Sequence, residues 1–194
     1  DGGMAKFDYA ATACASLAYM IQQQADAVGL TLFDEDVCKQ VPPSNTRAGL
    51  GHLFGALEQA KARNNKTKVG GVLHQLATQI RQRGMVLIFS DLFDDPATVV
   101  QGLRELASRG HDVVVFHVLD RDEVEFPFER MTLFEGLEQM PELLCDPKSL
   151  RDAYLAEIEG FAEAIRKGCL QQRIDYVRVV DSMPLDVVLT SYLS

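Results

Sequence analysis

The chain lacks several features that would assign it to a functional class. It has no tryptophan, and its 4 cysteines are scattered without a C-x-x-C pair, which gives no sign of a zinc ribbon or a dithiol redox site. The longest apolar runs, Met85–Phe89 and Val113–Phe116, fall far short of the roughly 20 residues that span a bilayer. We therefore expect no membrane span, and reduced thiols in a cytoplasmic protein.

Positive charge is also scarce. The 194 residues include 19 Lys and Arg against 28 Asp and Glu, which gives a net charge of −9. Because binding to nucleic acid depends on cationic contacts to phosphate, we expect no nucleic-acid partner. A chain of this length buries about 70% of its unfolded surface when it folds, so a single domain over residues 1–194 is the simplest organisation.

Common catalytic motifs are missing as well. The sequence contains no G-x-S-x-G elbow, Walker loop or G-x-G-x-x-G fingerprint, so neither acyl nor nucleotide chemistry is indicated. Its 4 histidines do not have the spacing of a zinc site. His117 lies within an apolar run, and we expect it to be a core residue.

Hydrophobic periodicity predicts most of the secondary structure. Asp95 and Pro96 form a helix start, and Gly84 is expected to end the helix before it. The helices are predicted over residues 7–24, 46–63, 69–83, 96–110, 148–172 and 185–193. A hairpin over 27–33 and 37–41 is expected to end at Pro42 and Pro43, and the other strands are predicted over 85–89, 112–119, 131–134, 142–145 and 175–180.

The alternation of strands and helices defines the expected fold class. The runs 85–89 and 112–119 are apolar throughout, which is typical of strands that are covered on both faces. Strands that alternate with helices pair in parallel through right-handed crossovers. We therefore predict an α/β fold with a doubly wound, mostly parallel sheet flanked by helices.

Ligands of such sheets bind beyond the carboxyl ends of the strands. Asp91 follows one buried strand, and Asp120 and Asp122 follow another. Thr67 lies just before a predicted helix. Asp91 and Thr67 are the candidate functional residues, although an aspartate here also forms turns and a threonine also caps helices.

Short segments in chain order then match one known family: Lys6–Ala10, Asp26–Phe33, Phe89–Asp95, Arg109–Val115, Phe126–Phe128, Asp146–Pro147 and Ile174–Tyr176. The first two resemble the first helix and second strand of von Willebrand factor A-like domains. Together the segments resemble the bacterial domain-of-unknown-function family fifty-eight, whose members often accompany MoxR-type AAA+ ATPases. The resemblance covers essentially the whole chain.

The resemblance implies a three-layer, Rossmann-like fold and a metal-ion-dependent adhesion site. In that site Mg²⁺ is held by a D-x-S-x-S motif, a loop threonine and an aspartate, and it binds a carboxylate of a protein partner. Thr67 matches the loop threonine and Asp91 matches the aspartate. Mg²⁺ prefers such oxygen ligands.

The chain departs from the family at its start. It contains no D-x-S-x-S, and Asp1–Met4 falls where the loop after that motif belongs. The first, central strand is therefore expected to be missing through N-terminal truncation. We expect the gap to close, to take a borrowed strand, or to be filled by exchange of elements in a homodimer. Mg²⁺ binding to this chain is expected to be weak or absent.

Three functions follow from these observations. The first is a non-enzymatic protein-interaction module with an incomplete metal site, acting as an adaptor for a MoxR-type AAA+ ATPase. The second is a phosphoryl-transfer enzyme that uses Asp91, although no second acid or cation is placed for that chemistry in the sequence. The third is a structural or interaction domain that needs no metal.

Overall fold

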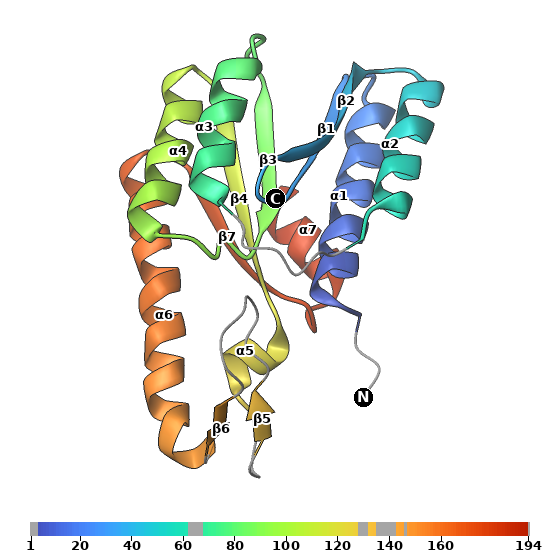
Figure 1. Ribbon diagram of the computed structural model, residues 1–194. Helices are drawn as coiled ribbons and strands as arrows, with labels where there is room; N and C mark the ends of the chain where they lie inside the picture. Colours follow the sequence, from blue (N-terminus) through green and yellow to red (C-terminus); the bar gives the residue numbers. More distant parts are fainter. Residues whose placement is uncertain (1–3, 62–67, 128–131, 135–142, 146, 194) are drawn as a thin grey trace.

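The computed structural model describes residues 4–61, 68–127, 132–134, 143–145 and 147–193. Figure 1 shows strands between two layers of helices. The helices are α1 (Lys6–Gln23), α2 (Arg47–Gln59), α3 (Val69–Gln79), α4 (Pro96–Ser108), α5 (Arg121–Glu125), α6 (Pro147–Gln171) and α7 (Leu185–Leu193). The strands are β1 (Val28–Phe33), β2 (Val37–Ser44), β3 (Met85–Ser90), β4 (Asp112–Leu119), β5 (Thr132–Phe134), β6 (Leu143–Cys145) and β7 (Asp175–Val180).

The main sheet is parallel, as predicted. Its strand order is β3-β4-β7, and β4 is the central strand. Ser90 of β3 lies opposite His117 of β4, which in turn lies opposite Arg178 of β7. Because all three strands run the same way, their carboxyl ends meet at one edge of the sheet.

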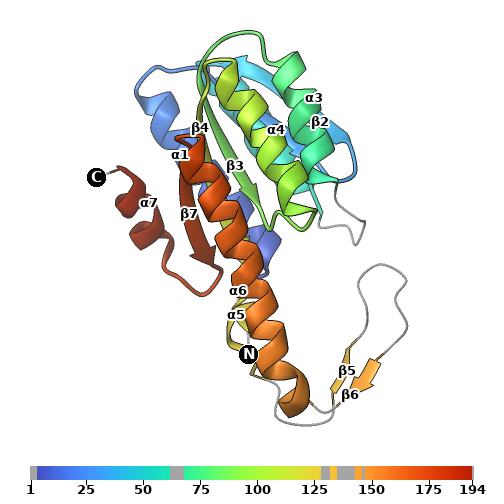
Figure 2. The ribbon, with the colours of Figure 1, turned by 90° about the vertical axis from the view of Figure 1, so that its left-hand side faces the viewer.

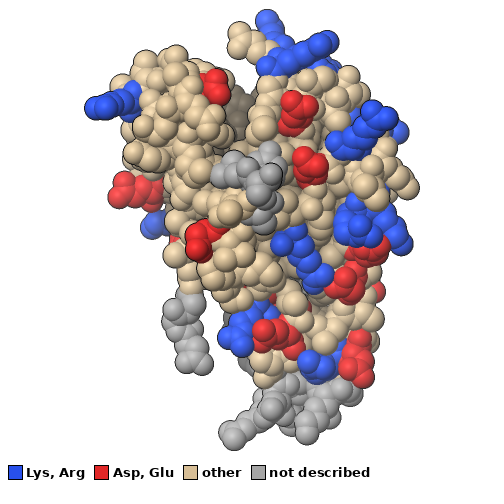
Figure 3. All heavy atoms as spheres, turned by 180° about the vertical axis from the view of Figure 1, so that it is seen from behind, with Lys and Arg blue, Asp and Glu red and all other residues tan. Residues whose placement is uncertain are grey.

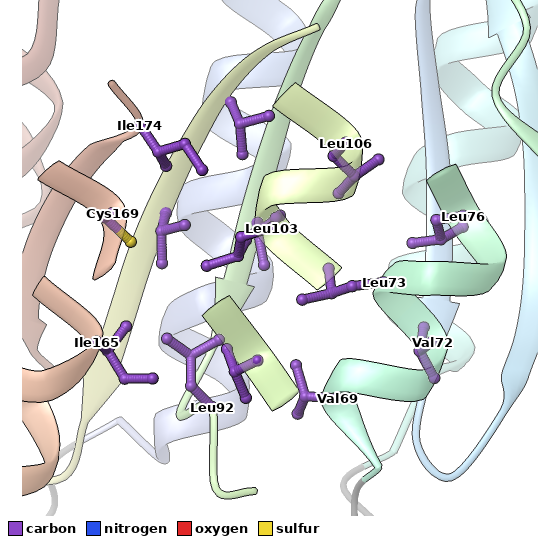
Figure 4. Packing of buried hydrophobic residues seen from close by; sticks show 14 of the residues in the cluster. Val69, Val72, Leu73, Leu76, Leu92, Leu103, Leu106, Ile165, Cys169 and Ile174 are labelled. Carbon is purple, nitrogen blue, oxygen red and sulfur yellow. The ribbon is translucent and has the colours of Figure 1, made fainter. Parts of the chain in front are cut away.

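Helices cover both faces of this sheet (Figure 2). On one face, α3, α4 and α6 enclose a core that includes Leu73, Leu103 and Ile165 (Figure 4). On the other face, Tyr9 and Leu17 of α1 pack with residues of β4, β7 and α7. The predicted α/β class, with helices on both sides of a parallel sheet, is confirmed.

A second sheet stands apart from the first. It consists of β1 and β2, which pair in antiparallel fashion. Its apolar residues pack against α1 and α2 through Ala18, Leu53 and Leu57. In Figure 1 this pair lies on the opposite side of a gap from β3. Among the described strands none lies between β1 and β3, where the sequence led us to expect a missing central strand.

Burial differs between the two strands that were predicted to be covered on both faces. β4 is buried from Val113 to Leu119, as expected. In β3 only Ile88 is fully buried. The physical reason is that β4 has a neighbour on each side, whereas β3 is the edge strand of its sheet.

Some predicted boundaries are wrong. β2 continues through Pro42 and Pro43 to Ser44, which an edge strand tolerates because its outer side needs no N–H donors. α2 and α3 end at Gln59 and Gln79, each four residues before the predicted end. Gly84 therefore does not end α3, and the residues before it connect α3 to β3.

Two local predictions are confirmed. Asp95 caps α4 by accepting a hydrogen bond from the Thr98 N–H at 2.9 Å, and Pro96 is the first residue of that helix. His117 is fully buried, and its Nδ1 lies 2.6 Å from the Tyr176 hydroxyl. None of the described helices is long and apolar enough to cross a membrane.

Candidate functional site

Asp91 lies at the carboxyl end of β3, where the chain turns sharply. Leu92, the next residue, has φ +57° and is fully buried. A non-glycine residue in this left-handed conformation costs roughly 1–2 kcal/mol. Burial of the Leu92 side chain in the core opposes that cost. The tight turn leaves the Asp91 carboxylate at the sheet edge with 29% of its side chain exposed.

Three hydrogen bonds from backbone N–H groups to side-chain oxygens hold the loop after β3. The Leu92 N–H donates to Ser90 Oγ at 3.0 Å, and the Phe93 N–H donates to Asp91 Oδ1 at 3.4 Å. Asp94 Oδ2 accepts from the Gly70 N–H at 3.1 Å. Since the N-cap residue of α3 provides no side-chain hydrogen bond, Asp94 satisfies a donor at that helix start from a neighbouring loop.

Lys6 connects α1 to this edge. Its Nζ lies 3.0 Å from Asp91 Oδ2 and 2.8 Å from Glu123 Oε1. The same ammonium lies 5.5 Å from the centroid of the Phe93 ring, within the range of a cation–π contact. Asp91, Lys6 and Glu123 are called the Asp91 cluster below.

Glu123 is held by its own helix. Asp120 Oδ1 accepts from the Asp122 N–H at 2.7 Å, and the Asp120 N–H donates to Glu123 Oε2 at 2.8 Å. This is a capping box at the start of α5. One Glu123 oxygen therefore fixes the helix start while the other contacts Lys6.

The Asp91 cluster keeps Lys6 charged. Burial lowers the pKa of Lys6, but the negative charges and hydrogen bonds of Asp91 and Glu123 outweigh burial and leave this pKa above its usual value of 10.5. The ammonium is thus a permanent cation between two carboxylates at physiological pH.

An aspartate follows each strand of the main sheet. Asp91 follows β3, Asp120 follows β4 and Asp181 follows β7. Asp181 Oδ1 accepts from the Arg121 N–H at 3.0 Å. Burial, with the nearby charges of Asp120 and Asp122, raises the pKa of Asp181 above its usual value. The carboxyl edge therefore carries several acidic side chains.

The described residues do not fit a Mg²⁺ site by themselves. They contain no group of three or more His, Cys, Asp or Glu side chains placed to hold a metal ion. The two acids of the Asp91 cluster share the Lys6 ammonium instead. Thr67, the other predicted ligand, lies outside the described residues, so its distance from Asp91 stays a prediction.

The sequence reasoning missed Lys6 and Glu123. A signal existed for each. A lysine in the first turn of a helix opposes the helix dipole, which indicates an acidic partner elsewhere. The sequence Asp120-Arg121-Asp122-Glu123 has the spacing of a capping box. Neither signal shows that the two residues meet beside Asp91.

A groove adjoins the Asp91 cluster, and we call it the inter-sheet groove. Its volume is about 2690 Å³, and its lining includes residues 28–33 of β1, residues 85–90 of β3, and one face of α1. Figure 3 shows a hollow between the two parts of the molecule at the top of that view. Lys6, Asp91 and Glu123 also line the groove, which therefore continues to the cluster.

This parallel sheet between helix layers has the three-layer, Rossmann-like architecture of von Willebrand factor A-like domains. The chain belongs to the family described as protein of unknown function DUF58, whose family model matches residues 2–162.

A solved structure supports the fold. The chain is similar to the conserved hypothetical protein BatB from Bacteroides thetaiotaomicron, with a TM-score of 0.62 and 17% identity over 96% of this chain and 84% of that chain. At this identity the likeness concerns the fold alone. A search of curated proteins found no match.

Proposed function

We propose that this domain is a non-enzymatic protein-interaction module whose contact surface is the carboxyl edge around Asp91. The observation that carries the proposal is the partly exposed Asp91 carboxylate, held in place by Lys6 and by the turn at Leu92. A fixed charged group at the edge of a rigid sheet suits recognition of another protein.

The contacts of Asp91 fix the orientation of its carboxylate. Asp91 Oδ2 lies against Lys6, and Oδ1 accepts from the Phe93 N–H. Each oxygen keeps a further lone pair, so the fixed carboxylate can still accept a hydrogen bond from a partner group. This arrangement supports the proposed binding role.

The proposed partner is a MoxR-type AAA+ ATPase, as the family resemblance implies, and the proposed cellular location is the cytoplasm. A partner carboxylate would bind through Mg²⁺, which prefers oxygen ligands and keeps several waters. Such a site needs ligands beyond those that the described residues provide. The Lys6 contact favours a second candidate, a metal-independent interaction domain, because an ammonium already neutralises the two acids.

The test is a binding measurement with a purified MoxR-type ATPase from the same organism. Biolayer interferometry compares the unmodified chain with Asp91→Ala and with Asp112→Ala, each with Mg²⁺ and with EDTA. Asp112 is a matched control, since it is an exposed aspartate at the opposite end of the parallel sheet. We expect Asp91→Ala to weaken binding at least tenfold and Asp112→Ala to leave it unchanged.

The outcomes separate the candidates. Loss of binding in EDTA supports the metal-assisted module, and unchanged binding in EDTA supports the metal-independent one. Equal binding by Asp91→Ala and the unmodified chain contradicts the proposed surface. Turnover of a generic phosphomonoester that disappears in Asp91→Asn would favour the enzyme.

A further inference from the structure

An arginine precedes each strand of the main sheet. Arg83 lies two residues before β3, Arg109 three residues before β4, and Arg173 two residues before β7. Because the three strands are parallel, their amino ends meet at one edge of the sheet, opposite the edge that carries Asp91. All three arginines are exposed. We call Arg83, Arg109 and Arg173 the arginine edge.

The backbone holds Arg109 and Arg173 in fixed positions. The Arg109 N–H donates to the Leu106 carbonyl oxygen at 3.2 Å, directly after α4. Arg173 has φ +57°, and its N–H donates to the Leu170 carbonyl oxygen at 3.2 Å. The next residue, Ile174, is buried in the core. Both turns are therefore anchored, and little backbone freedom is lost when a partner binds there.

The Arg83 side chain reaches the turn that contains Arg109. Gly110 has φ +85°, which favours glycine, and a Cβ on Gly110 would lie 2.9 Å from Arg83 Nε. The Asp112 N–H donates to the Gly84 carbonyl oxygen at 3.2 Å, which joins this turn to the one before β3. The glycine thus leaves the space that Arg83 occupies, and two of the arginines belong to adjoining turns.

The arginine edge carries unpaired positive charge in an acidic chain. Among the residues that the structure describes, no carboxylate forms an ion pair with Arg83, Arg109 or Arg173. Asp112 and Asp175 begin β4 and β7 at the same edge, and both are exposed. The edge is therefore cationic, with two acids between its arginines.

This chemistry selects carboxylates on a flexible segment. A guanidinium presents its N–H donors as a fork that fits a carboxylate with two parallel hydrogen bonds. Asp112 and Asp175 oppose a continuous anionic surface such as a membrane, whereas a peptide can place its carboxylates between them. Leu170 is 69% exposed, and its carbonyl accepts the Arg173 N–H, so an apolar side chain adjoins the arginines.

We propose that the arginine edge binds an extended acidic segment of a partner protein, rich in Asp and Glu and with one apolar residue that packs on Leu170. This surface lies at the other end of the sheet from Asp91 and does not depend on the function proposed for Asp91. A domain that binds a partner at each edge joins two proteins.

Synthetic peptides test the proposal on the whole chain. The probe is a short, capped, fluorescent peptide of Asp and Glu with one central Leu, and its control replaces the acids by Asn and Gln. Fluorescence anisotropy at low salt should show at least tenfold tighter binding of the acidic peptide than of the control, because the control offers no carboxylates to the guanidinium groups. Equal binding of the two peptides would overturn the proposal.

Paired variants separate local contacts from the field of the whole protein. Arg109→Gln/Arg173→Gln should weaken binding of the acidic peptide at least tenfold. Arg47→Gln/Lys39→Gln removes the same charge from exposed positions on α2 and β2 and should weaken it less than twofold. Far-UV circular dichroism shows whether each variant keeps its helices. If the folded variants bind the peptide equally, the arginine edge is not the binding site.

Two single variants provide an independent arm. Arg83→Gln should weaken binding of the acidic peptide at least threefold. Leu170→Ser should do the same for the peptide with Leu, and it should not affect a peptide in which Ala replaces that Leu. If neither variant weakens binding, the proposal is wrong. It is also wrong if vesicles of phosphatidylserine and phosphatidylcholine bind through Arg109 and Arg173 and the acidic peptide does not.

Discussion

The Lys6 ammonium lies 3.0 Å from the carboxylate of Asp91 and joins the start of α1 to the end of β3. Lys6 is the first residue of α1, where the helix dipole disfavours a positive charge. Its contacts with Asp91 and Glu123 are therefore the reason that a cation is tolerated there. This relationship has consequences for stability and for metal binding.

Lys6→Gln should destabilise the fold by about 1–3 kcal/mol, because it leaves two partly buried carboxylates without their shared cation. Urea denaturation gives the free energy of unfolding. Lys39→Gln, at an exposed lysine of β2, is the control and should change stability by less than about 0.5 kcal/mol. If the two variants change the free energy of unfolding equally, the Asp91 cluster contributes little to stability.

Mg²⁺ should bind more tightly to Lys6→Gln than to the unmodified chain. The ammonium competes with a metal ion for Asp91 and Glu123, and its removal frees two oxygen ligands. Isothermal titration calorimetry should detect weak or no binding by the unmodified chain, stronger binding by Lys6→Gln, and loss of that gain in the double variant Lys6→Gln/Asp91→Asn. Tight binding by the unmodified chain would contradict the competition.

Acid should destabilise the fold through His117. Burial lowers the pKa of His117 from 6.5 to about 4, although Asp91 acts in the opposite direction. Between these values the unfolded chain binds a proton that the folded chain does not. Stability from this group is therefore lost as the pH falls from about 6.5 to about 4, by up to about 3 kcal/mol.

His117→Gln isolates that contribution, since glutamine can still accept a hydrogen bond from the Tyr176 hydroxyl. The slope of unfolding free energy between pH 4 and pH 6.5 should be smaller in this variant. His52→Gln, at an exposed histidine, should retain the original slope. If both variants keep the slope of the unmodified chain, His117 is not the group that binds a proton on unfolding.

Gly70→Ala should destabilise the contact between α3 and α4. A Cβ at Gly70 would lie 2.8 Å from the carbonyl oxygen of Thr98, so the backbones must move apart. We expect a loss of about 1–3 kcal/mol, measured by thermal unfolding. Gly51→Ala is the control within α2, where a Cβ meets no atom within 4 Å. It should stabilise by about 0.5–1 kcal/mol, and a similar gain at Gly70 would contradict the close packing.

Apolar runs and helix caps, which are local patterns of the sequence, were enough to predict most helices and strands. The β4 run is apolar because helices cover both its faces, and α4 begins where Asp95 and Pro96 provide a cap and a fixed φ. The end of α3 was predicted incorrectly because apolar spacing continues to Ile80. The packing of the helices against the sheet decides where α3 ends and the chain turns back toward β3.

The site was predictable only in part. Asp91 follows an apolar run that the sequence predicts to be a buried strand, and that position alone identified it. Its contacts with Lys6 and Glu123 join residues far apart in the sequence. The charges of the three residues were visible in the sequence, but their separation in space was not. Thr67 lies outside the described residues, so its predicted place beside Asp91 is untested.

The order of helices and strands was already determined by the sequence, because hydrophobic spacing and helix caps act over a few neighbouring residues. Tertiary structure alone decided that Asp94 accepts a hydrogen bond from the start of α3 and that Lys6 lies between Asp91 and Glu123. Both results depend on how distant segments pack together, and burial and charge pairing at that range leave no periodic signal along the chain.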